Sequence, residues 1–339
     1  MNFQDRKNAF INLGQYLSHL SEREKAELFA GVQQRNPWFI PESTATALQG
    51  IISYLQAADM EKWLADYTFP ENLPRKVGVV MAGNIPAVGF HDMLCVLLSG
   101  NILFAKLSSQ DEVMMRFLMA CLLEVEPALK NYIVIAERLN EVKALIATGS
   151  DNTSRYFEYY FRHVPHVLRK NRTAVAVLSG KESHEALQRL GKDIFLYFGL
   201  GCRNVSKLYV PEGYDFTHFF EAIKSFSNLV QHNKYLNNYE YKKAVFLLNQ
   251  MPHFDNGFVL LQENENLVSP IAVLYFSYYQ QLADVEQLLL ANQEKIQCIV
   301  SEDELIKNSF AFGQAQQPRV WDYADGVDTL QFLSQLSVD

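Results

Sequence analysis

The chain has 339 residues, 49% of them hydrophobic and 20% charged, and its 30 basic and 38 acidic side chains give a net charge of −8. This length and composition are typical of a globular protein with one large domain or two to three smaller ones. The acidic balance disfavours a nucleic-acid partner, because a polyanion is normally bound by a concentrated basic face. The first residues lack an apolar signal core, and the longest apolar run, residues 93–105, is interrupted by Ser99, Gly100 and Asn101. We therefore expect a cytoplasmic protein without a membrane span.

The cysteines are few and scattered along the chain. None of them follows another at CxxC spacing, which disfavours a zinc site and a disulfide framework. We therefore expect no bound metal, and any cysteine chemistry has to come from a single thiol. The four cysteines are Cys95, Cys121, Cys202 and Cys298.

The first 70 residues have the pattern of helices. Phe10, Leu13 and Leu17 recur at helical spacing. Ser21 followed by Glu24 is typical of a helix start, in which the two residues cap each other's backbone. We expect an N-terminal helical segment over residues 1–70 that acts as a lid or a packing arm.

From Pro74 onward, short apolar runs alternate with amphipathic stretches. This alternation predicts strands and helices in turn, and hence a parallel sheet covered by helices. We assign a nucleotide-binding α/β domain to residues 71–173. The predicted strands are residues 77–81, 102–106 and 132–136, and the predicted helices are residues 88–98 and 111–124.

A second region of the same kind predicts another α/β domain over residues 174–318, in which the reactive cysteine would lie. We expect the two domains to be closely packed, since no flexible linker separates them. The C-terminal segment, residues 319–339, either packs back on the first domain or forms an arm between subunits. The strands predicted here are residues 174–178, 207–211, 244–248 and 271–275.

Polar residues follow the first two predicted strands, although no GxGxxG fingerprint is present. Asn84 lies on a turn between Gly83 and Pro86, where its side-chain amide suits an oxyanion at the carboxyl end of a parallel strand. Lys106 ends the second strand, and the hydroxyls that follow it suit a ribose or a phosphate. Each residue also has a purely structural interpretation, Asn84 as a turn former and Lys106 as a solvated strand end. The hydroxyl residues are Ser108 and Ser109.

Two further segments are candidates for chemistry. Gly149 and Ser150 open a predicted helix, and a helix N-terminus with a hydroxyl binds phosphate, although Ser150 is equally suited to be only a cap. Cys202 lies between glycines and Arg203, where small neighbours allow substrate to approach and a cation favours a reactive thiolate. The alternative for Cys202 is a small buried hydrophobic residue.

The order of these features resembles that of the aldehyde dehydrogenase superfamily over residues 77–270. Within it, the chain is most similar to the acyl-CoA reductase family, typified by the fatty-acid reductase component of bacterial bioluminescence. Residues 312–318 and 322–326 resemble the carboxyl-terminal segment of that family. The features in their order are Asn84-x-Pro86, Lys106-x-Ser108, Thr148-Gly149-Ser150 and Gly199-x-x-Cys202.

This resemblance implies an aldehyde dehydrogenase-like α/β fold of two packed parallel-sheet domains with an N-terminal helical arm. It also implies reduction of an acyl-CoA thioester to an aldehyde by NAD(P)H, through an acyl-enzyme and with neither metal nor flavin. The implied catalytic residues are Cys202 as nucleophile and Asn84 as oxyanion donor. The implied cofactor-binding residues are Lys106, Ser108 and Ser109 near the adenosine ribose and Gly149 and Ser150 near the pyrophosphate.

The departures from the superfamily are informative. Oxidising members carry a glutamate that activates water, whereas the matching residues 167–172 contain no carboxylate, which favours thioester reduction over hydrolysis. Residues 266–270 replace the segment that grips the nicotinamide ribose. Where those members often carry an acid that repels a 2′-phosphate, this chain has Ser109, which favours NADPH over NADH.

Other functions fit the same residues. The substrate could be an acyl phosphate or an aldehyde, or the chain could be an inactive nucleotide-binding or assembly subunit in which Cys202 is incidental. The aromatic run that includes Tyr156 and Phe161 suits either an acyl tunnel or plain core. The resemblance to a fatty-acid reductase leaves open a homo-oligomer and a partner protein that activates or transfers the acyl group.

Overall fold

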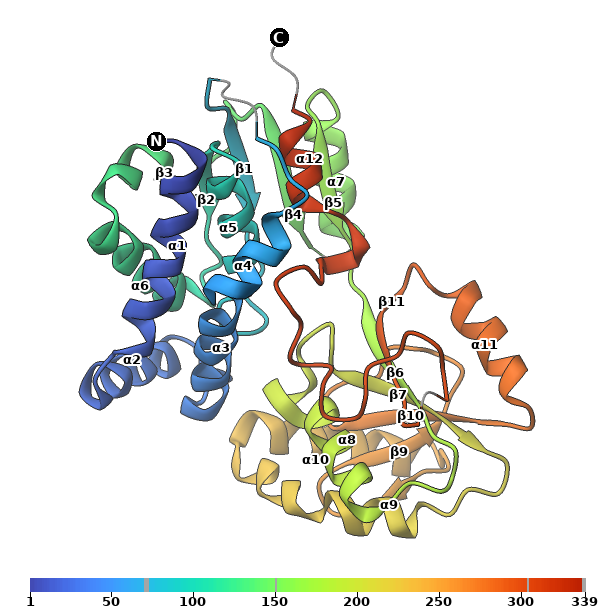
Figure 1. Cartoon of the computed structure of the whole chain (residues 1–339). Coiled ribbons are helices and arrows are strands. Elements are labelled where there is room, and N and C mark those ends of the chain that lie inside the picture. Colours follow the sequence, from blue (N-terminus) through green and yellow to red (C-terminus); the bar gives the residue numbers. More distant parts are fainter. Residues whose placement is uncertain (70–72, 150, 304, 337–339) are drawn as a thin grey trace. The chain divides into compact units, whose positions relative to one another are not determined.

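The computed structural model describes residues 1–69, 73–149, 151–303 and 305–336. It is a mixed α/β structure with two sheets (Figure 1). No helix within these residues is both long enough and apolar enough to cross a bilayer. In chain order the elements are α1 (Phe3–Ser18), α2 (Glu22–Arg35), α3 (Pro41–Tyr54), α4 (Ala57–Leu64), β1 (Lys76–Val80), α5 (Phe90–Leu98), β2 (Ile102–Lys106), α6 (Glu112–Val125), η1 (Pro127–Tyr132), β3 (Ile133–Ile135), β4 (Ala144–Thr148), α7 (Asp151–Phe161), β5 (His166–Arg169), β6 (Thr173–Val177), α8 (His184–Phe195), η2 (Leu196–Gly199), β7 (Val205–Pro211), α9 (Phe216–Ala222), η3 (Ile223–Gln231), α10 (Asn233–Leu248), β8 (Phe254–Asp255), β9 (Leu260–Glu263), β10 (Val273–Tyr279), α11 (Leu282–Ala291), β11 (Ile296–Val300), η4 (Ala324–Gly326) and α12 (Thr329–Ser334), where η marks a 3₁₀ helix.

The chain divides into two structural units. Unit 1 comprises Met1–Asn171 together with Pro318–Asp339, and unit 2 comprises Arg172–Gln317. The N-terminal helices and the C-terminal segment therefore both belong to the unit that contains β1. Each unit has its own sheet and its own buried core.

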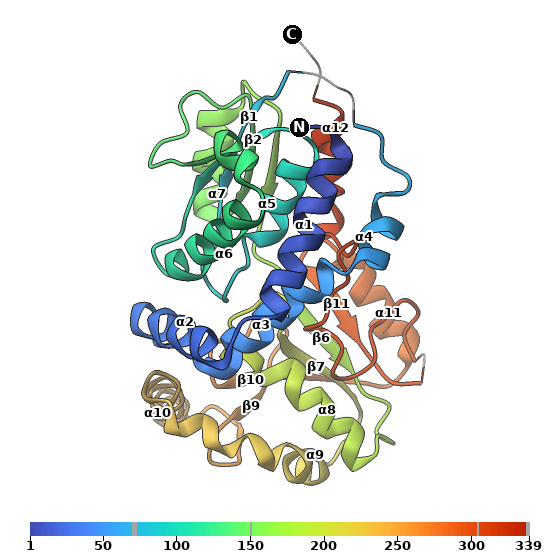
Figure 2. The ribbon, with the colours of Figure 1, turned by 60° about the vertical axis from the view of Figure 1, so that its left-hand side comes forward.

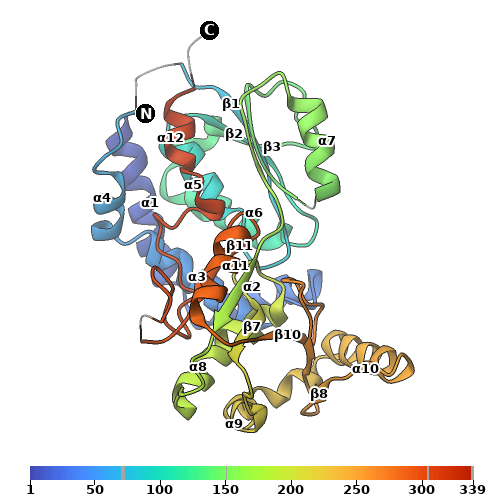
Figure 3. The same ribbon diagram turned by 90° about the vertical axis from the view of Figure 1, so that its right-hand side faces the viewer.

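The sheet of unit 1 has the strand order β3-β2-β1-β4-β5, and all its strands are parallel. Because alternate side chains of a strand point to opposite faces, Val77 and Val79 enter the main core while Val80 joins a smaller cluster on the other face. Helices cover both faces, as expected for a parallel sheet. Figure 3 shows α7 on one side of the strands and α5 and α12 on the other.

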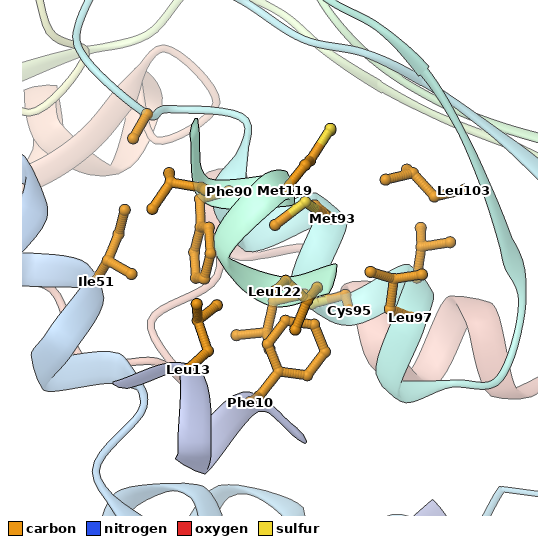
Figure 4. Close-up of a cluster of buried hydrophobic side chains, with 14 of the residues drawn as sticks. Phe10, Leu13, Ile51, Phe90, Met93, Cys95, Leu97, Leu103, Met119 and Leu122 are labelled. Carbon is orange, nitrogen blue, oxygen red and sulfur yellow. The ribbon is translucent and has the colours of Figure 1, made fainter. Parts of the chain in front are cut away.

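The N-terminal helices pack on the sheet of unit 1 through α5 and α6. Helix α1 contacts both of them and also α3 (Figure 2). In Figure 4, Phe10 and Leu13 of α1 point into a cluster with Phe90 and Leu122, and all four side chains are fully or almost fully buried. The shared burial of these apolar side chains, each worth about 1.5–3 kcal/mol, makes the helices part of this core. The predicted start of α2 is confirmed, because Ser21 accepts from the Glu24 backbone and Glu24 from the Ser21 backbone.

The C-terminal segment is held on unit 1 by aromatic side chains. Trp63 Nε1 donates to the Tyr323 hydroxyl at 2.9 Å, and the Tyr67 hydroxyl donates to Asp328 at 2.6 Å. The imidazole of His91 lies 2.7 Å from the Val320 carbonyl oxygen. Leu330 and Leu333 of α12 complete the attachment by entering the main core.

The sheet of unit 2 has the order β11-β6-β7-β10-β9-β8, in which only the β8–β9 pair is antiparallel among the strands that the structure describes. Leu208 and Val210 of β7 enter the core beneath α8 and α9, whereas Tyr209 faces the cluster beneath α11. Strand β7 is therefore central and buried on both faces, and it begins directly after the segment that carries Cys202.

One predicted strand is wrong. Residues 244–248 form the last part of α10, a helix of 16 residues. Tyr235, Tyr239 and Phe246 are its buried side chains, at intervals of four and seven residues, whereas Leu247 and Leu248 are exposed. The apolar run thus includes residues on the solvent-exposed side of a helix. Its composition is typical of a strand, but the buried residues of the whole segment recur at helical spacing.

Candidate functional site

The candidate site residues of unit 1 lie at the edge of its sheet where the carboxyl ends of the strands meet. Asn84 follows β1, Lys106 ends β2, and Gly149 follows β4, so all three are at the carboxyl ends of adjacent parallel strands. Ligands of open α/β sheets bind at this edge. Asn84 and Lys106 are exposed, as is Ser109. Ser108 is half-buried, and Ser150 lies outside the described residues.

Two loops at this edge are packed tightly on each other. A Cβ at Gly83 would collide with the Ser108 hydroxyl, so only glycine allows this approach. Ala87 has a φ of 57°, and its backbone N–H donates to Asp111 Oδ2 at 2.9 Å. The turn that carries Asn84 is therefore fixed at both ends against the loop that carries Ser108.

Asp111 is the buried acid of this edge. Its side chain is 3% exposed, and its Oδ1 atom has no hydrogen-bond partner among the described residues. Burial raises the pKa of Asp111 to about 8, and the hydrogen bond from Ala87 offsets only part of that effect. Asp111 is therefore largely uncharged at neutral pH, and it adds no negative charge to the loop after β2.

The end of β5 holds a buried cation. Arg169 Nη1 donates to both carboxylate oxygens of Asp92, at 2.6 and 2.7 Å, and Nη2 donates to the Thr329 hydroxyl at 2.8 Å. The charge of Asp92 raises the pKa of Arg169 against the effect of burial. Strand β5 thus ends in a guanidinium that is paired with a carboxylate. The backbone of Arg169 is also bound, because the Gly149 N–H donates to its carbonyl oxygen at 3.2 Å.

In unit 2, Cys202 lies on the connection between α8 and β7. The preceding 3₁₀ helix, η2, contains three successive residues in the left-handed region, Tyr197 at φ 54°, Phe198 at φ 57° and Gly199 at φ 76°. Left-handed backbone is costly for residues with side chains and persists where the surroundings enforce it, which is common at functional sites. Both aromatic side chains are buried, and this burial holds the turn.

Asn204 fixes the turn around Cys202. Its Oδ1 accepts from the Gly201 backbone N–H at 2.8 Å, and its Nδ2 donates to the carbonyls of Ile194 and Leu196 at 3.3 and 2.7 Å. The side chain is 1% exposed. One amide thereby joins the end of α8 to the residue that precedes Cys202, and the position of the thiol depends on it.

The segment that follows Phe312 is attached to both sides of the cysteine turn. Buried Asp193, at the end of α8, accepts from the N–H groups of Gly313 and Ala315 at 2.6 and 3.0 Å. Arg203 Nη1 donates to the Ala315 carbonyl at 3.0 Å. Burial raises the pKa of Asp193 to about 7, against the effect of these two backbone donors.

Cys202 differs from the other three cysteines in exposure. Cys202 is partly exposed, whereas Cys95 on α5, Cys121 on α6 and Cys298 on β11 are buried. Burial raises the pKa of the Cys121 thiol to about 11 and of the Cys298 thiol to about 12, and it also raises that of Cys95. The three buried thiols are therefore poor nucleophiles at neutral pH.

The structure gathers the predicted unit 1 residues Asn84, Lys106, Ser108, Ser109 and Gly149 at one sheet edge, and it places Cys202 in unit 2. Sequence reasoning assigned no role to several polar residues that shape the two parts. Each stands next to a recognised segment, and this was the available signal. They are Asp111, Arg169, Asp193 and Asn204.

Comparison with models of protein families identifies the family of this chain. The model of the acyl-CoA reductase (LuxC) family matches residues 39–225, which is more than half of the chain. No curated protein matches the chain in sequence.

Solved structures show the same fold at low sequence identity. The E. coli NADP dependent enzyme is 14% identical with a TM-score of 0.66, and the match covers 93% of this chain and 76% of that one. The P. syringae indole-3-acetaldehyde dehydrogenase in complex with NAD+ is 12% identical with a TM-score of 0.67, and the aldehyde dehydrogenase of Bacillus cereus in complex with NAD+ is 12% identical with a TM-score of 0.62. Each of these two matches covers 88% of this chain and 72% of the other. The chain has an aldehyde dehydrogenase-like α/β fold and belongs to the acyl-CoA reductase (LuxC) family.

Proposed function

We propose that this protein reduces an acyl-CoA thioester to an aldehyde, with NADPH as reductant and with Cys202 as the residue that carries the acyl group. The observation that carries the proposal is the environment of Cys202. It is the partly exposed thiol of the chain, it follows a left-handed turn, and Asn204 holds the residue before it, in a member of an acyl-CoA reductase family.

The residues at the unit 1 sheet edge fit a nicotinamide dinucleotide. Lys106 offers an ammonium group, and Ser108 and Ser109 offer hydroxyls at the end of β2, with no carboxylate in residues 106–110. This donor set suits a ribose that carries a phosphate. We assign Lys106, Ser108 and Ser109 to the adenosine ribose and Gly149 and Ser150 to the pyrophosphate.

In the first step, the Cys202 thiolate attacks the thioester carbonyl. The oxyanion that forms accepts hydrogen bonds from the Asn84 side-chain amide and from the Cys202 backbone N–H, which lower the barrier because they bind the charge as it develops. The tetrahedral species then expels coenzyme A as a thiolate. The acyl group remains on Cys202 as a thioester.

In the second step, the acyl-Cys202 thioester is reduced. A bound reduced nicotinamide supplies the hydride. Cys202 then holds a thiohemiacetal, whose carbon–sulfur bond breaks to release the aldehyde and restore the thiol with one proton taken up. Hydrolysis should compete poorly, because residues 167–172, which match the segment that carries the water-activating glutamate in oxidising members of the superfamily, contain no carboxylate.

Mass spectrometry of the acylated protein tests the role of Cys202. Incubation with acyl-CoA thioesters from acetyl to hexadecanoyl should add one acyl mass to the peptide that contains Cys202. Cys202→Ala should lose the adduct and turnover, with the Kd for NADPH changed less than about twofold, since other segments hold the nucleotide. Cys298→Ala is the matched control from the same unit and should keep the adduct. Full reductase activity in Cys202→Ala would overturn the proposal.

A further inference from the structure

The last residue of α2 contacts the loop that follows β2. Arg35 Nε donates to the Ser109 carbonyl oxygen at 2.8 Å, and both residues belong to unit 1. Helix α2 packs beside α6, and a Cβ at Gly31 would lie 3.7 Å from the Val113 side chain. A residue of the N-terminal helical segment thus lies at the sheet edge assigned to the cofactor.

The charges around this contact are mainly positive. The side chain of Arg35 is 49% exposed, and its Nη2 lies 3.8 Å from Glu112 Oε2. The carboxylate of Glu112 is more closely paired with Arg116, at 2.7 Å. Glu112 thus has two arginine partners, and exposed Lys106 ends the strand that leads into this loop. Asp111 adds little negative charge, because burial raises its pKa to about 8.

The position of Arg35 corresponds to a general feature of dinucleotide binding. Strand β1, helix α5 and strand β2 form a parallel βαβ unit. In such units the ribose hydroxyls lie near the end of the second strand, where an acid binds the 2′-hydroxyl of NAD or a nearby arginine accommodates the 2′-phosphate of NADP. Here residues 106–110 contain no acid, and the guanidinium of Arg35 is held at Ser109 by a hydrogen bond.

We infer that Arg35 binds the 2′-phosphate of NADPH and is the residue that selects NADPH over NADH. This inference rests on the proposed function for the place of the adenosine ribose. Guanidinium groups bind phosphate through parallel, charge-assisted hydrogen bonds, and the terminal nitrogens of Arg35 extend beyond the Nε–Ser109 contact. The N-terminal helical segment then supplies cofactor specificity as well as packing.

Binding measurements on the full chain without substrate test this inference. The Kd values for NADPH, NADH and the probe 2′-AMP would be measured by calorimetry for the wild type, Arg35→Gln and Arg116→Gln. Arg116 is the matched control, because it is also half-exposed and also contacts Glu112. Arg35→Gln should weaken the binding of NADPH and of 2′-AMP about tenfold or more, since the variant loses the charge-assisted hydrogen bonds of the guanidinium to the 2′-phosphate. The Kd for NADH should change less than about twofold, and Arg35→Lys should recover part of the lost affinity for NADPH.

The outcomes separate this inference from the proposed function. Equal weakening of NADPH and NADH binding by Arg35→Gln would mean that Arg35 only anchors the loop, and unchanged Kd values for both nucleotides would mean that it has no role. Tighter binding of NADH than of NADPH by the wild type would also overturn the inference. In these three cases the proposed thioester reduction through Cys202 stands, and in the third its reductant would be NADH instead of NADPH. If the wild type binds neither nucleotide, both fail. Thermal unfolding of Arg35→Gln would show that the variant is folded.

Discussion

Asn84 is an exposed side chain on a turn whose backbone is fixed by other residues. Gly83 lies against Ser108, and Ala87 donates to Asp111, so contacts on both sides of Asn84 hold the backbone of the turn. A turn that is held in this way suits an oxyanion donor, because the donor must be in place before charge develops.

We predict that Asn84→Ala slows acylation of Cys202 by roughly 10²- to 10³-fold, the usual cost of one oxyanion donor. The melting temperature should change little, because the side chain is exposed. Asn131, another exposed asparagine of unit 1, provides the control variant Asn131→Ala, which should acylate normally. Rapid-quench kinetics beside thermal unfolding check this, and a loss of stability with unchanged acylation would assign Asn84 to the turn.

The sequence singles out a candidate site residue where a side chain has unusual chemistry for its neighbours. Cys202 between glycines and Lys106 at a strand end are candidates of this kind, and their roles remain predictions. Asn204 and Asp193 were not predictable, because their importance comes from backbone groups that only the folded turn brings to them. Asp111 resembles an ordinary helix-start residue in sequence, and its isolation from water is a property of the packed loops.

At the scale of elements, Asp111 joins the turn after β1 to the start of α6. Its carboxyl group accepts from Ala87 through one oxygen, while the other oxygen is buried without a partner among the described residues. A neutral side chain is therefore favoured here, and ionisation of Asp111 costs stability in the folded state.

We predict that Asp111→Asn becomes more stable relative to the wild type as pH rises. The pKa of Asp111 in the folded state is about 8, above the ordinary value of 3.8, so the stability present in acid is lost as pH rises from about 4 through about 8. Asparagine keeps an acceptor for Ala87 but cannot ionise. Denaturant unfolding at pH 5 and pH 8.5 should show a gain of at least about 1 kcal/mol for the variant at the higher pH, since one pKa unit corresponds to about 1.4 kcal/mol. A stability difference that is independent of pH would show that Asp111 ionises normally.

Helices and strands were predictable where the residue composition and the spacing of the apolar residues indicate the same element. Strand β2 matches its predicted bounds, and β1, α5 and α6 match within about two residues. Strands β4 and β5 were missed, the latter because His166 and Arg169 gave it the composition of a basic surface segment. Buried pairing with Asp92 is what makes Arg169 acceptable inside the fold.

At the scale of the whole molecule, the family and the aldehyde dehydrogenase-like fold were predictable because the order of short segments along the chain is specific even where each segment is weak. The expected α/β organisation is confirmed by two largely parallel sheets and by the similar solved structures. The pairing of Arg169 with Asp92 and Thr329 was not predictable, because these residues are far apart in sequence.

The most direct test of the account is the release of coenzyme A in the absence of nicotinamide. Mixing the protein with acyl-CoA should release about one equivalent of coenzyme A per Cys202 and then stop, because residues 167–172 lack the glutamate that activates water in oxidising members of the superfamily. Addition of NADPH should restart release and yield aldehyde. Continuous release without nicotinamide would contradict the account, since it would require a hydrolytic base and would make the protein a thioesterase.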